Sequence, residues 1–316
     1  MSNEQRVTGT LAGPPRVQIQ TMSGCNGRCV FCPNEELLKT DAEHGRMSLD
    51  LFRKIIDELA ETHPRRILLY LMNEPLADKR MPELVQYTAE RVPETTTLIT
   101  TNGTYLNASL SESLIDAGLK RLKVSLQSLD PEINREIMGY SSEKVIENVI
   151  TAQRIIKKKR AKQFDLRVSM VVTSLNLPEI EQTRSFWRKH GVRLVTSALE
   201  NRGGNIAAAE NLNPDGLGMR SMGDCIRPSR DMCVLFNGDV ALCCVDWFRT
   251  TVVGNVAQQS LREVWNGPEL QRIREGLHEG NAAKLPPICV NCTESACPNH
   301  HRRGLKGWFN RLAAAF

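Results

Sequence analysis

The stretch Gly24-Cys25-Asn26-Gly27-Arg28-Cys29-Val30-Phe31-Cys32-Pro33-Asn34 follows an apolar run, and its cysteines have the spacing C-x3-C-x2-C. Three thiolates this close in sequence can bind three irons of a four-iron cluster, whereas the bacterial ferredoxin run supplies cysteines at other spacings and a ligand to every iron. The next cysteine, Cys225, is far along the chain. The spacing therefore predicts a cluster with one iron open to a small molecule. The alternatives are a disulfide loop or a structural zinc site, which takes four ligands.

This spacing resembles that of the radical S-adenosylmethionine (SAM) superfamily. The resemblance implies that Cys25, Cys29 and Cys32 bind a 4Fe–4S cluster, whose open iron chelates SAM through its amino and carboxylate groups. It also implies reductive cleavage of SAM to a 5′-deoxyadenosyl radical, which abstracts hydrogen from an unactivated C–H bond. Phe31 stands where members of the superfamily usually carry an aromatic residue beside the adenine.

The composition is that of a globular protein. The chain has 316 residues, 41% hydrophobic and 24% charged, which predicts a large domain with a smaller one. No segment resembles a signal peptide or a membrane span, so we expect a cytoplasmic protein without membrane association. Ten cysteines in a reducing compartment indicate metal binding or catalysis rather than disulfides. The net charge of +5 is mild, and no basic and aromatic stripe indicates nucleic-acid binding.

From residue 17, short apolar runs alternate with helical patterns. In Leu49–Glu61 the apolar residues keep helical spacing, and Ser48 is the expected N-cap. Six strand–helix units in series predict a parallel sheet. Because six units are fewer than a closed barrel needs, we expect an α/β fold with a partial (β/α)6 TIM-like barrel and its chemistry at the C-terminal strand ends. The predicted strands are Val17–Thr21, Arg66–Met72, Thr96–Thr101, Arg121–Leu126, Leu166–Thr173 and Val192–Ala198.

The pattern changes after Ala198. Two apolar runs flank Asn237-Gly238-Asp239, which predicts a hairpin. A helical stretch over 260–279, broken near Gly267-Pro268, leads to Cys289-x2-Cys292. We therefore predict an N-terminal tail (1–16), the barrel (17–200), a connector (201–224), a small metal-stapled domain (225–299) and a basic C-terminal tail (300–316).

The cysteines of the small domain form a second constellation. Cys225 is followed by twelve residues, Gly238, four residues and Cys243, and then by Cys289-x2-Cys292. This pattern resembles the twitch form of the SPASM extension of radical SAM enzymes, which implies that the four cysteines bind an auxiliary 4Fe–4S cluster. Their grouping also suits tetrahedral zinc. Neighbours on a strand point to opposite faces, so Cys244 is not expected on the same cluster. The plain interpretation of Cys233 and Cys297 is a small buried hydrophobe.

The resemblance to the superfamily also assigns SAM-binding residues. A Gly-Gly-Glu-like motif after the second strand is replaced here by Met72-Asn73-Glu74, in which Glu74 keeps the carboxylate for the SAM amino group and Asn73 replaces glycine. The other assigned positions are Thr101 and Asn102 after the third strand, Ser125 on the fourth, and Arg167 on the fifth, which is expected to reach the SAM carboxylate. A turn or a cap is the plain alternative at each position.

The motif Asn201-Arg202-Gly203-Gly204, the Cys-Pro-Asn at the end of the first motif, and the auxiliary spacing resemble twitch enzymes that oxidise aminocyclitols. This implies attack on a carbinol C–H of an aminoglycoside or aminocyclitol, with Arg202 on the hydroxyl at the reacting carbon. It also implies an electron donor such as flavodoxin or ferredoxin. An arginine that binds a loop carbonyl is the plain alternative.

Two outcomes are open for the resulting carbon radical. Related epimerases use a cysteine to return hydrogen from the opposite face, and related dehydrogenases lack a cysteine at the position of Cys244, so its presence favours epimerisation with Cys244 as hydrogen donor. Oxidation to a ketone through the auxiliary cluster is the alternative. Peptide modification is a further one, although only 24 residues precede Cys25. A non-catalytic iron–sulfur carrier needs neither an open iron nor a SAM-site carboxylate such as Glu74.

Overall fold

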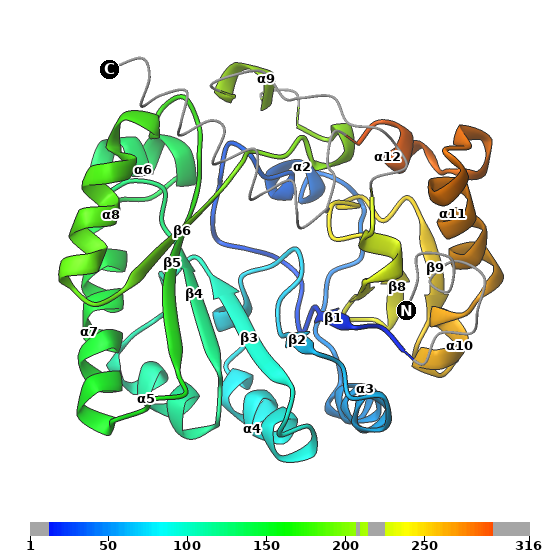
Figure 1. Ribbon diagram of the computed structural model, residues 1–316, viewed down its shortest axis with the longest axis horizontal. Helices are drawn as coiled ribbons and strands as arrows, with labels where there is room; N and C mark the ends of the chain where they lie inside the picture. Colours follow the sequence, from blue (N-terminus) through cyan, green and yellow to red (C-terminus); the bar gives the residue numbers. More distant parts are fainter. Residues whose placement is uncertain (1–12, 207–208, 214–224, 293–316) are drawn as a thin grey trace.

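A computed structural model describes residues 13–206, 209–213 and 225–292. These residues build one sheet of nine strands in the order β6-β5-β4-β3-β2-β1-β7-β8-β9 (Figure 1). Neighbours from β6 to β7 are parallel, and the last two pairs are antiparallel. The six predicted barrel strands are all present, and the partial barrel is confirmed. Its strands are β1 (Arg16–Ile19), β2 (Arg66–Leu68), β3 (Thr96–Thr101), β4 (Arg121–Ser125), β5 (Asp165–Val171) and β6 (Arg193–Ser197).

Strand β2 is shorter than its apolar sequence predicts. It ends at Leu68, although Leu69 N still donates to Leu98 O at 3.0 Å. The chain then turns at Met72, whose φ of 52° lies in the left-handed region that strands do not use. The turn brings Asn73 beside Gly24, the residue before the first cysteine.

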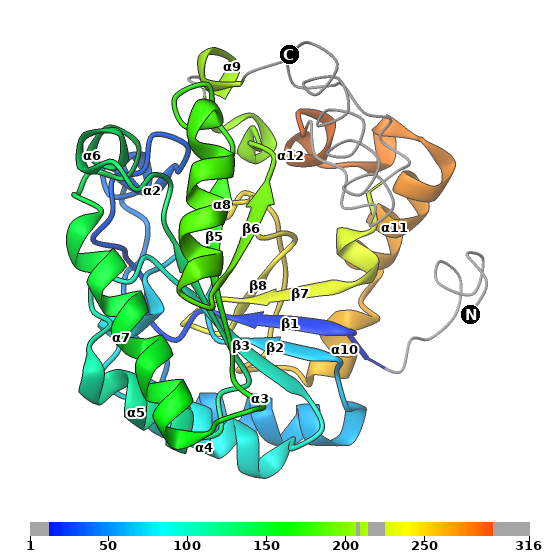
Figure 2. The same cartoon turned by 60° about the vertical axis from the view of Figure 1, so that its left-hand side comes forward.

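Helices cover the outer face of the parallel strands (Figures 1 and 2). That face is apolar: Val17, Ile67, Ile99, Leu122 and Val168 belong to one buried cluster with helix residues such as Phe52 and Trp187. Ser48 caps the helix that follows the first loop, as predicted, because its side chain accepts from Leu51 N. The helices of this region are α2 (Asn34–Leu37), α3 (Leu49–Thr62), α4 (Met81–Arg91), α5 (Ala108–Asp116), α6 (Pro131–Met138), α7 (Glu143–Lys159) and α8 (Ile180–Lys189), with 3-10 turns η1 (Pro75–Ala77) and η2 (Leu177–Glu179).

The C-terminal part continues the barrel sheet. Figure 2 shows β7 (Asp231–Val234) next to β1, and the two are parallel, with Gln18 opposite Cys233. The predicted hairpin is present between β7 and β8 (Asp239–Ala241), with Gly238 at φ 92° in its turn. The sequence predicts a small appendage here, but the sheet runs across that boundary.

The remaining elements enclose the second set of cysteines. The predicted break at Gly267-Pro268 is found between α10 (Leu261–Trp265) and α11 (Pro268–Glu279), where proline stands at the first turn of the second helix. Cys289 lies in α12 (Pro287–Val290). The other elements are β9 (Val252–Asn255), α9 (Ala209–Leu212) and the 3-10 turns η3 (Arg202–Gly204), η5 (Arg227–Ser229) and η6 (Ala282–Lys284). Cys297 and the basic tail 300–316 lie outside the described residues.

Candidate functional site

The loop with the first three cysteines lies at the C-terminal edge of the sheet, directly after β1, as barrel chemistry requires. Its backbone is held by the end of α6, because Arg28 N and Val30 N donate to Met138 O and Ile137 O at 3.1 and 3.0 Å. Asn34 Nδ2 spans the loop and donates to Cys25 O and Gly27 O. The loop therefore keeps its shape through bonds that do not use its sulfur atoms.

The sulfur atoms of this loop surround Gly27. A Cβ on Gly27 would lie 3.5 Å from Cys25 Sγ and 3.7 Å from Cys29 Sγ. Burial raises the pKa of Cys25 to about 11, burial and the neighbouring thiols Cys32 and Cys25 raise that of Cys29, and burial raises that of Cys32. Bound iron would supply the positive charge that three buried thiolates lack. Within the described ranges, no three His, Cys, Asp or Glu side chains converge on one ion. Separate sulfurs around a small residue fit a multi-iron cluster, in which each thiolate binds its own iron.

The chain itself engages the Glu74 carboxylate at three points. Oε1 accepts from Thr101 Oγ1 at 2.6 Å and from Leu76 N at 2.9 Å, and Oε2 accepts from Asn102 N at 2.7 Å. Glu74 is 1% exposed, and burial raises its pKa. This carboxylate thus joins the loop after β2 to the end of β3, and Oε2 keeps acceptor capacity for a ligand.

Two asparagines complete this junction. Asn102 Nδ2 donates to Asn26 Oδ1 at 2.7 Å and approaches Cys25 Sγ at 3.9 Å, so the end of β3 contacts the cysteine loop directly. Asn73 Oδ1 accepts from Leu71 N, while its Nδ2 is buried without a partner. An unpaired buried amide donor beside Gly24 suits an acceptor such as a carboxylate.

The other predicted SAM-site residues have different positions. Phe31 packs in a buried apolar cluster with Ile137, Met138 and Leu199. Ser125 ends β4 on the inner face of the sheet. Arg167 is not brought to the site: it lies near the beginning of β5, and Asp165 binds its guanidinium at 2.6 Å. The cysteine loop is at the opposite strand ends, so we leave Arg167 out of the proposed SAM site.

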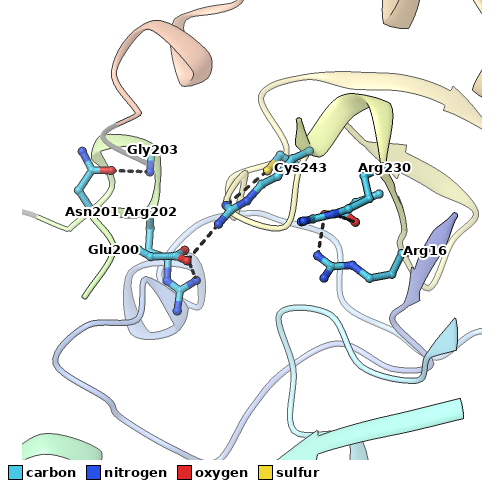
Figure 3. A network of polar contacts seen from close by, with 9 residues as sticks. Arg16, Glu200, Asn201, Arg202, Gly203, Arg230 and Cys243 are labelled. Carbon is cyan, nitrogen blue, oxygen red and sulfur yellow. Dashed lines mark hydrogen bonds and ion pairs between the residues drawn. The ribbon is translucent and has the colours of Figure 1, made fainter. Parts of the chain in front are cut away.

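A chain of polar contacts leads from Arg202 to Cys243, one of the second set of cysteines (Figure 3). Arg202 Nη1 binds Glu200 Oε2 at 3.0 Å, Arg227 Nη2 binds Glu200 Oε1 at 3.0 Å, and Arg227 Nη1 approaches Cys243 Sγ at 3.9 Å. The charge of Arg202 lowers the pKa of Cys29 and Cys32, against the effect of burial. Arg202 Nε is buried without a hydrogen-bond partner.

The connector also packs on the helix that carries Cys289. Asn201 Nδ2 donates to Asn291 O at 3.1 Å, and a Cβ on Gly203 would lie 2.5 Å from Ile288 Cδ1. Only glycine allows this approach, at a φ of 69°. The motif 201–204 thereby fixes α12 relative to Arg202.

Cysteines of the second set affect one another's pKa values. Burial, followed by the charges of Cys225 and Cys292, raises the pKa of Cys289 to about 12. Burial also raises the pKa of Cys225, while the contacts with Arg227 lower it and the charge of Cys244 raises it. The nine described cysteines are free thiols, which agrees with metal binding rather than with a disulfide framework.

Cys243 and Cys244 do not lie on a strand, contrary to the prediction, because β8 ends at Ala241. They occupy the turn that follows, where Cys243 donates a hydrogen bond that lowers the pKa of Cys244. Cys243 is buried beside Arg227, whereas Cys244 packs with Cys32 against one apolar cluster. That cluster consists of Leu37, Leu71, Met72, Cys233, Leu235, Ala241 and Trp247. The turn still gives the two thiols different surroundings.

Sequence comparison identifies the class of protein that this site defines. Residues 19–184 match the Radical SAM superfamily, and residues 225–293 match SPASM, an iron–sulfur cluster-binding domain. The chain belongs to the radical SAM superfamily. Enzymes of this class with a SPASM domain use SAM and 4Fe–4S clusters. No helix in the described part of the chain is long and apolar enough to cross a membrane.

One relative is similar over almost the whole chain: the S-adenosyl-L-methionine-dependent 2-deoxy-scyllo-inosamine dehydrogenase of Niallia circulans. It is 23% identical over 280 residues, which cover 87% of this chain and 91% of the relative. A GTP 3′,8-cyclase of Sulfurimonas denitrificans is 26% identical over 179 residues, and the match spans 56% of this chain and 53% of the cyclase.

Two solved structures share the fold. BtrN in complex with AdoMet and 2-DOIA has a TM-score of 0.63 at 20% identity, over 89% of this chain and 93% of BtrN. SuiB of Streptococcus suis bound to its precursor peptide SuiA has a TM-score of 0.67 at 16% identity, over 90% of this chain and 70% of SuiB.

Sequence reasoning missed Glu200 and Arg227, which join Arg202 to Cys243. No motif marks them, since their meaning depends on the distance between segments remote in sequence. In the sequence, Glu200 is marked only by its place before the motif 201–204, and Arg227 only by its place two residues after Cys225.

Proposed function

We propose that this radical SAM enzyme abstracts a carbinol hydrogen from an aminocyclitol- or aminoglycoside-type molecule and inverts that carbon, with Cys244 as hydrogen donor. The observation that carries the proposal is the position of Arg202, which is joined through Glu200 and Arg227 to Cys243, the neighbour of Cys244. The buried Nε of Arg202 has no partner and can donate to a substrate hydroxyl. A hydroxyl held there lies between the cysteine loop where the radical starts and the thiol that ends it.

When bound, SAM and the cluster on Cys25, Cys29 and Cys32 supply a 5′-deoxyadenosyl radical. Cys25, Cys29 and Cys32 hold that cluster, Asn73 and Glu74 offer a donor and an acceptor to the SAM amino-acid group, and the apolar residues around Phe31 exclude water. Cys225, Cys243, Cys289 and Cys292 hold the auxiliary cluster. Thr101 and Asn102 would position Glu74, because both donate hydrogen bonds to its carboxylate.

The proposed reaction consists of two hydrogen-atom transfers followed by reduction of the Cys244 sulfur radical. The carbinol carbon loses a hydrogen atom to the adenosyl radical, and Cys244 Sγ–H returns one from the opposite face. The sulfur-centred radical then takes one proton and one electron from a donor protein of the flavodoxin or ferredoxin type. When Cys243 binds iron it has no proton to donate, so the hydrogen bond that lowers the pKa of Cys244 is lost and Cys244 stays a protonated thiol.

Dehydrogenation is the second candidate, and the similarity to the dehydrogenase of Niallia circulans favours it. In that reaction the carbon radical loses its hydroxyl proton and passes one electron to an iron–sulfur acceptor, and a ketone forms. The likeness to SuiB with its precursor peptide extends to the fold alone, so it adds no support for peptide modification, the third candidate.

The test is anaerobic reconstitution followed by turnover of a panel of aminocyclitols and aminoglycosides in heavy water. Epimerisation gives a product of unchanged connectivity with one solvent deuterium, delivered through the exchangeable thiol. Cys244→Ala should still form 5′-deoxyadenosine but no inverted product, whereas the control Cys233→Ala, in the same apolar cluster, should still invert. A product lighter by two hydrogens, or unimpaired inversion by Cys244→Ala, overturns the epimerase assignment.

A further inference from the structure

The inner face of the parallel sheet is basic along the beginnings and middles of its strands. Its residues alternate with those buried under the helices, and the register between strands brings cations from β1 to β6 together. Asp165 binds Arg121 and Arg167, and Asp231 binds Arg16 and Arg230. Among the described residues of this face, cations outnumber these two carboxylates. The cations of the strands are Arg16, Arg66, Arg121, Lys123, Arg167 and Arg193.

Lys123 differs from the paired arginines of this face because no described residue balances its charge. It lies in the middle of β4, opposite Thr100 on one side and Arg167 on the other. The described residues give its ammonium no carboxylate and no hydrogen-bond partner. Burial, followed by the charges of Arg167, Arg16, Arg121 and Arg66, lowers the pKa of Lys123. A buried ammonium beside the Arg167 guanidinium on the neighbouring strand raises the free energy of the fold unless an anion joins it.

Lys123 lies in the middle of β4, at the same level of the sheet as Arg167. Its partner Thr100 directly precedes Thr101, which binds Glu74. Ser125 follows Lys123 on the same face, about 7 Å nearer the cysteine loop. Gln20, which is 1% exposed and lies between β1 and that loop, has an unpaired Oε1. Among the described residues, the inner face therefore offers an unpaired cation at Lys123 in the middle of β4, and an unpaired acceptor at Gln20 nearer the cysteine loop.

We propose that Lys123, flanked by Arg167, is an anion-binding subsite inside the barrel, which takes a phosphate or carboxylate group of the substrate. This deepens the proposed function and rests on it: the molecule that presents its carbinol to Arg202 also carries an anionic group that reaches toward the sheet. An anion gains charge-assisted hydrogen bonds from both side chains. A polycationic aminoglycoside without such a group would be repelled by this face, which narrows the class to acidic derivatives of cyclitols or sugars.

The test measures binding without turnover on the reconstituted full-length enzyme with SAM. The ligands are myo-inositol 1-phosphate, neutral myo-inositol, an aminocyclitol and inorganic phosphate, titrated by calorimetry at fixed ionic strength. The variants are Lys123→Met and the control Lys144→Met, since Lys144 on α7 is 70% exposed and pairs with Glu147. Formation of 5′-deoxyadenosine is recorded separately, so failure of radical chemistry is distinguished from failure of anion binding.

We expect the phosphorylated ligand to bind about tenfold or more tightly than neutral myo-inositol, and Lys123→Met, but not Lys144→Met, to abolish that preference. We also expect the melting temperature of Lys123→Met to be equal to or above that of the wild type, because an unbalanced buried cation is removed. Equal affinity for charged and neutral ligands, or a preference that survives Lys123→Met, overturns the proposal. A fall in melting temperature with unchanged phosphate binding shows a purely structural lysine and also overturns it.

Discussion

Replacement of Glu74 by glutamine tests whether this carboxylate organises the site or only binds SAM. The side chain is isosteric, so packing is kept while the charge and one acceptor are lost. In the wild type, Glu74 Oε2 accepts a hydrogen bond from Asn102 N at 2.7 Å. If the glutamine oxygen keeps the hydrogen bonds from Thr101 and Leu76, the glutamine nitrogen faces Asn102 N. A buried N–H is then left facing another donor.

The magnitude follows from that geometry. A hydrogen bond to a charged group contributes about 1.5–3 kcal/mol, and an unsatisfied buried donor costs about 1–3 kcal/mol. The raised pKa of Glu74 shows that burial disfavours its ionised form, and a neutral glutamine removes that penalty. We therefore expect Glu74→Gln to lower the free energy of unfolding by about 2 kcal/mol.

The assay is anaerobic urea unfolding of the cluster-free protein, in which neither SAM nor iron contributes. Glu147→Gln is the matched control, because Glu147 is 67% exposed and pairs only with Lys144 across one helical turn, and we expect no measurable change from it. SAM affinity of the reconstituted variant is measured in parallel. Wild-type stability combined with weakened SAM binding would refute the positioning role and restore the simple ligand role.

Four further substitutions test local geometry. Gly27→Ala should fold normally but bind less iron at the first cluster, because its Cβ would contact two ligand sulfurs. Iron analysis and the EPR signal of the reduced protein measure this, and full iron content would contradict it. Gly103→Ala should cost about 2–4 kcal/mol, because it combines a φ of 79° with a Cβ 2.7 Å from Val124 Cγ1. Gly280→Ala, at a φ of 65° in open space, should cost only about 1 kcal/mol, and equal losses for the two glycines would show that the clash is relieved. Ser48→Ala should cost about 1 kcal/mol through loss of the α3 cap, and an unchanged urea midpoint would contradict this.

Local chemistry in the sequence predicted much of the fold. The alternation of apolar runs gave the order of the barrel strands, Ser48 marked the start of α3, and Asn237-Gly238-Asp239 marked the hairpin. These features depend on neighbours in the chain. The position of Arg167 could also have been read correctly, because the predicted strand 166–173 already placed it near its beginning, far from the C-terminal strand ends.

Residue spacing along the chain was enough to predict three closely spaced cysteines after a strand, a second set of four cysteines, and membership of the radical SAM superfamily. How these parts meet depends on the folded chain. The pairing of β7 with β1, the contacts of Glu200 with Arg202 and Arg227, and the unbalanced charge of Lys123 each join segments remote in sequence. Their energies depend on distance and burial, which no spacing of residues along the chain specifies.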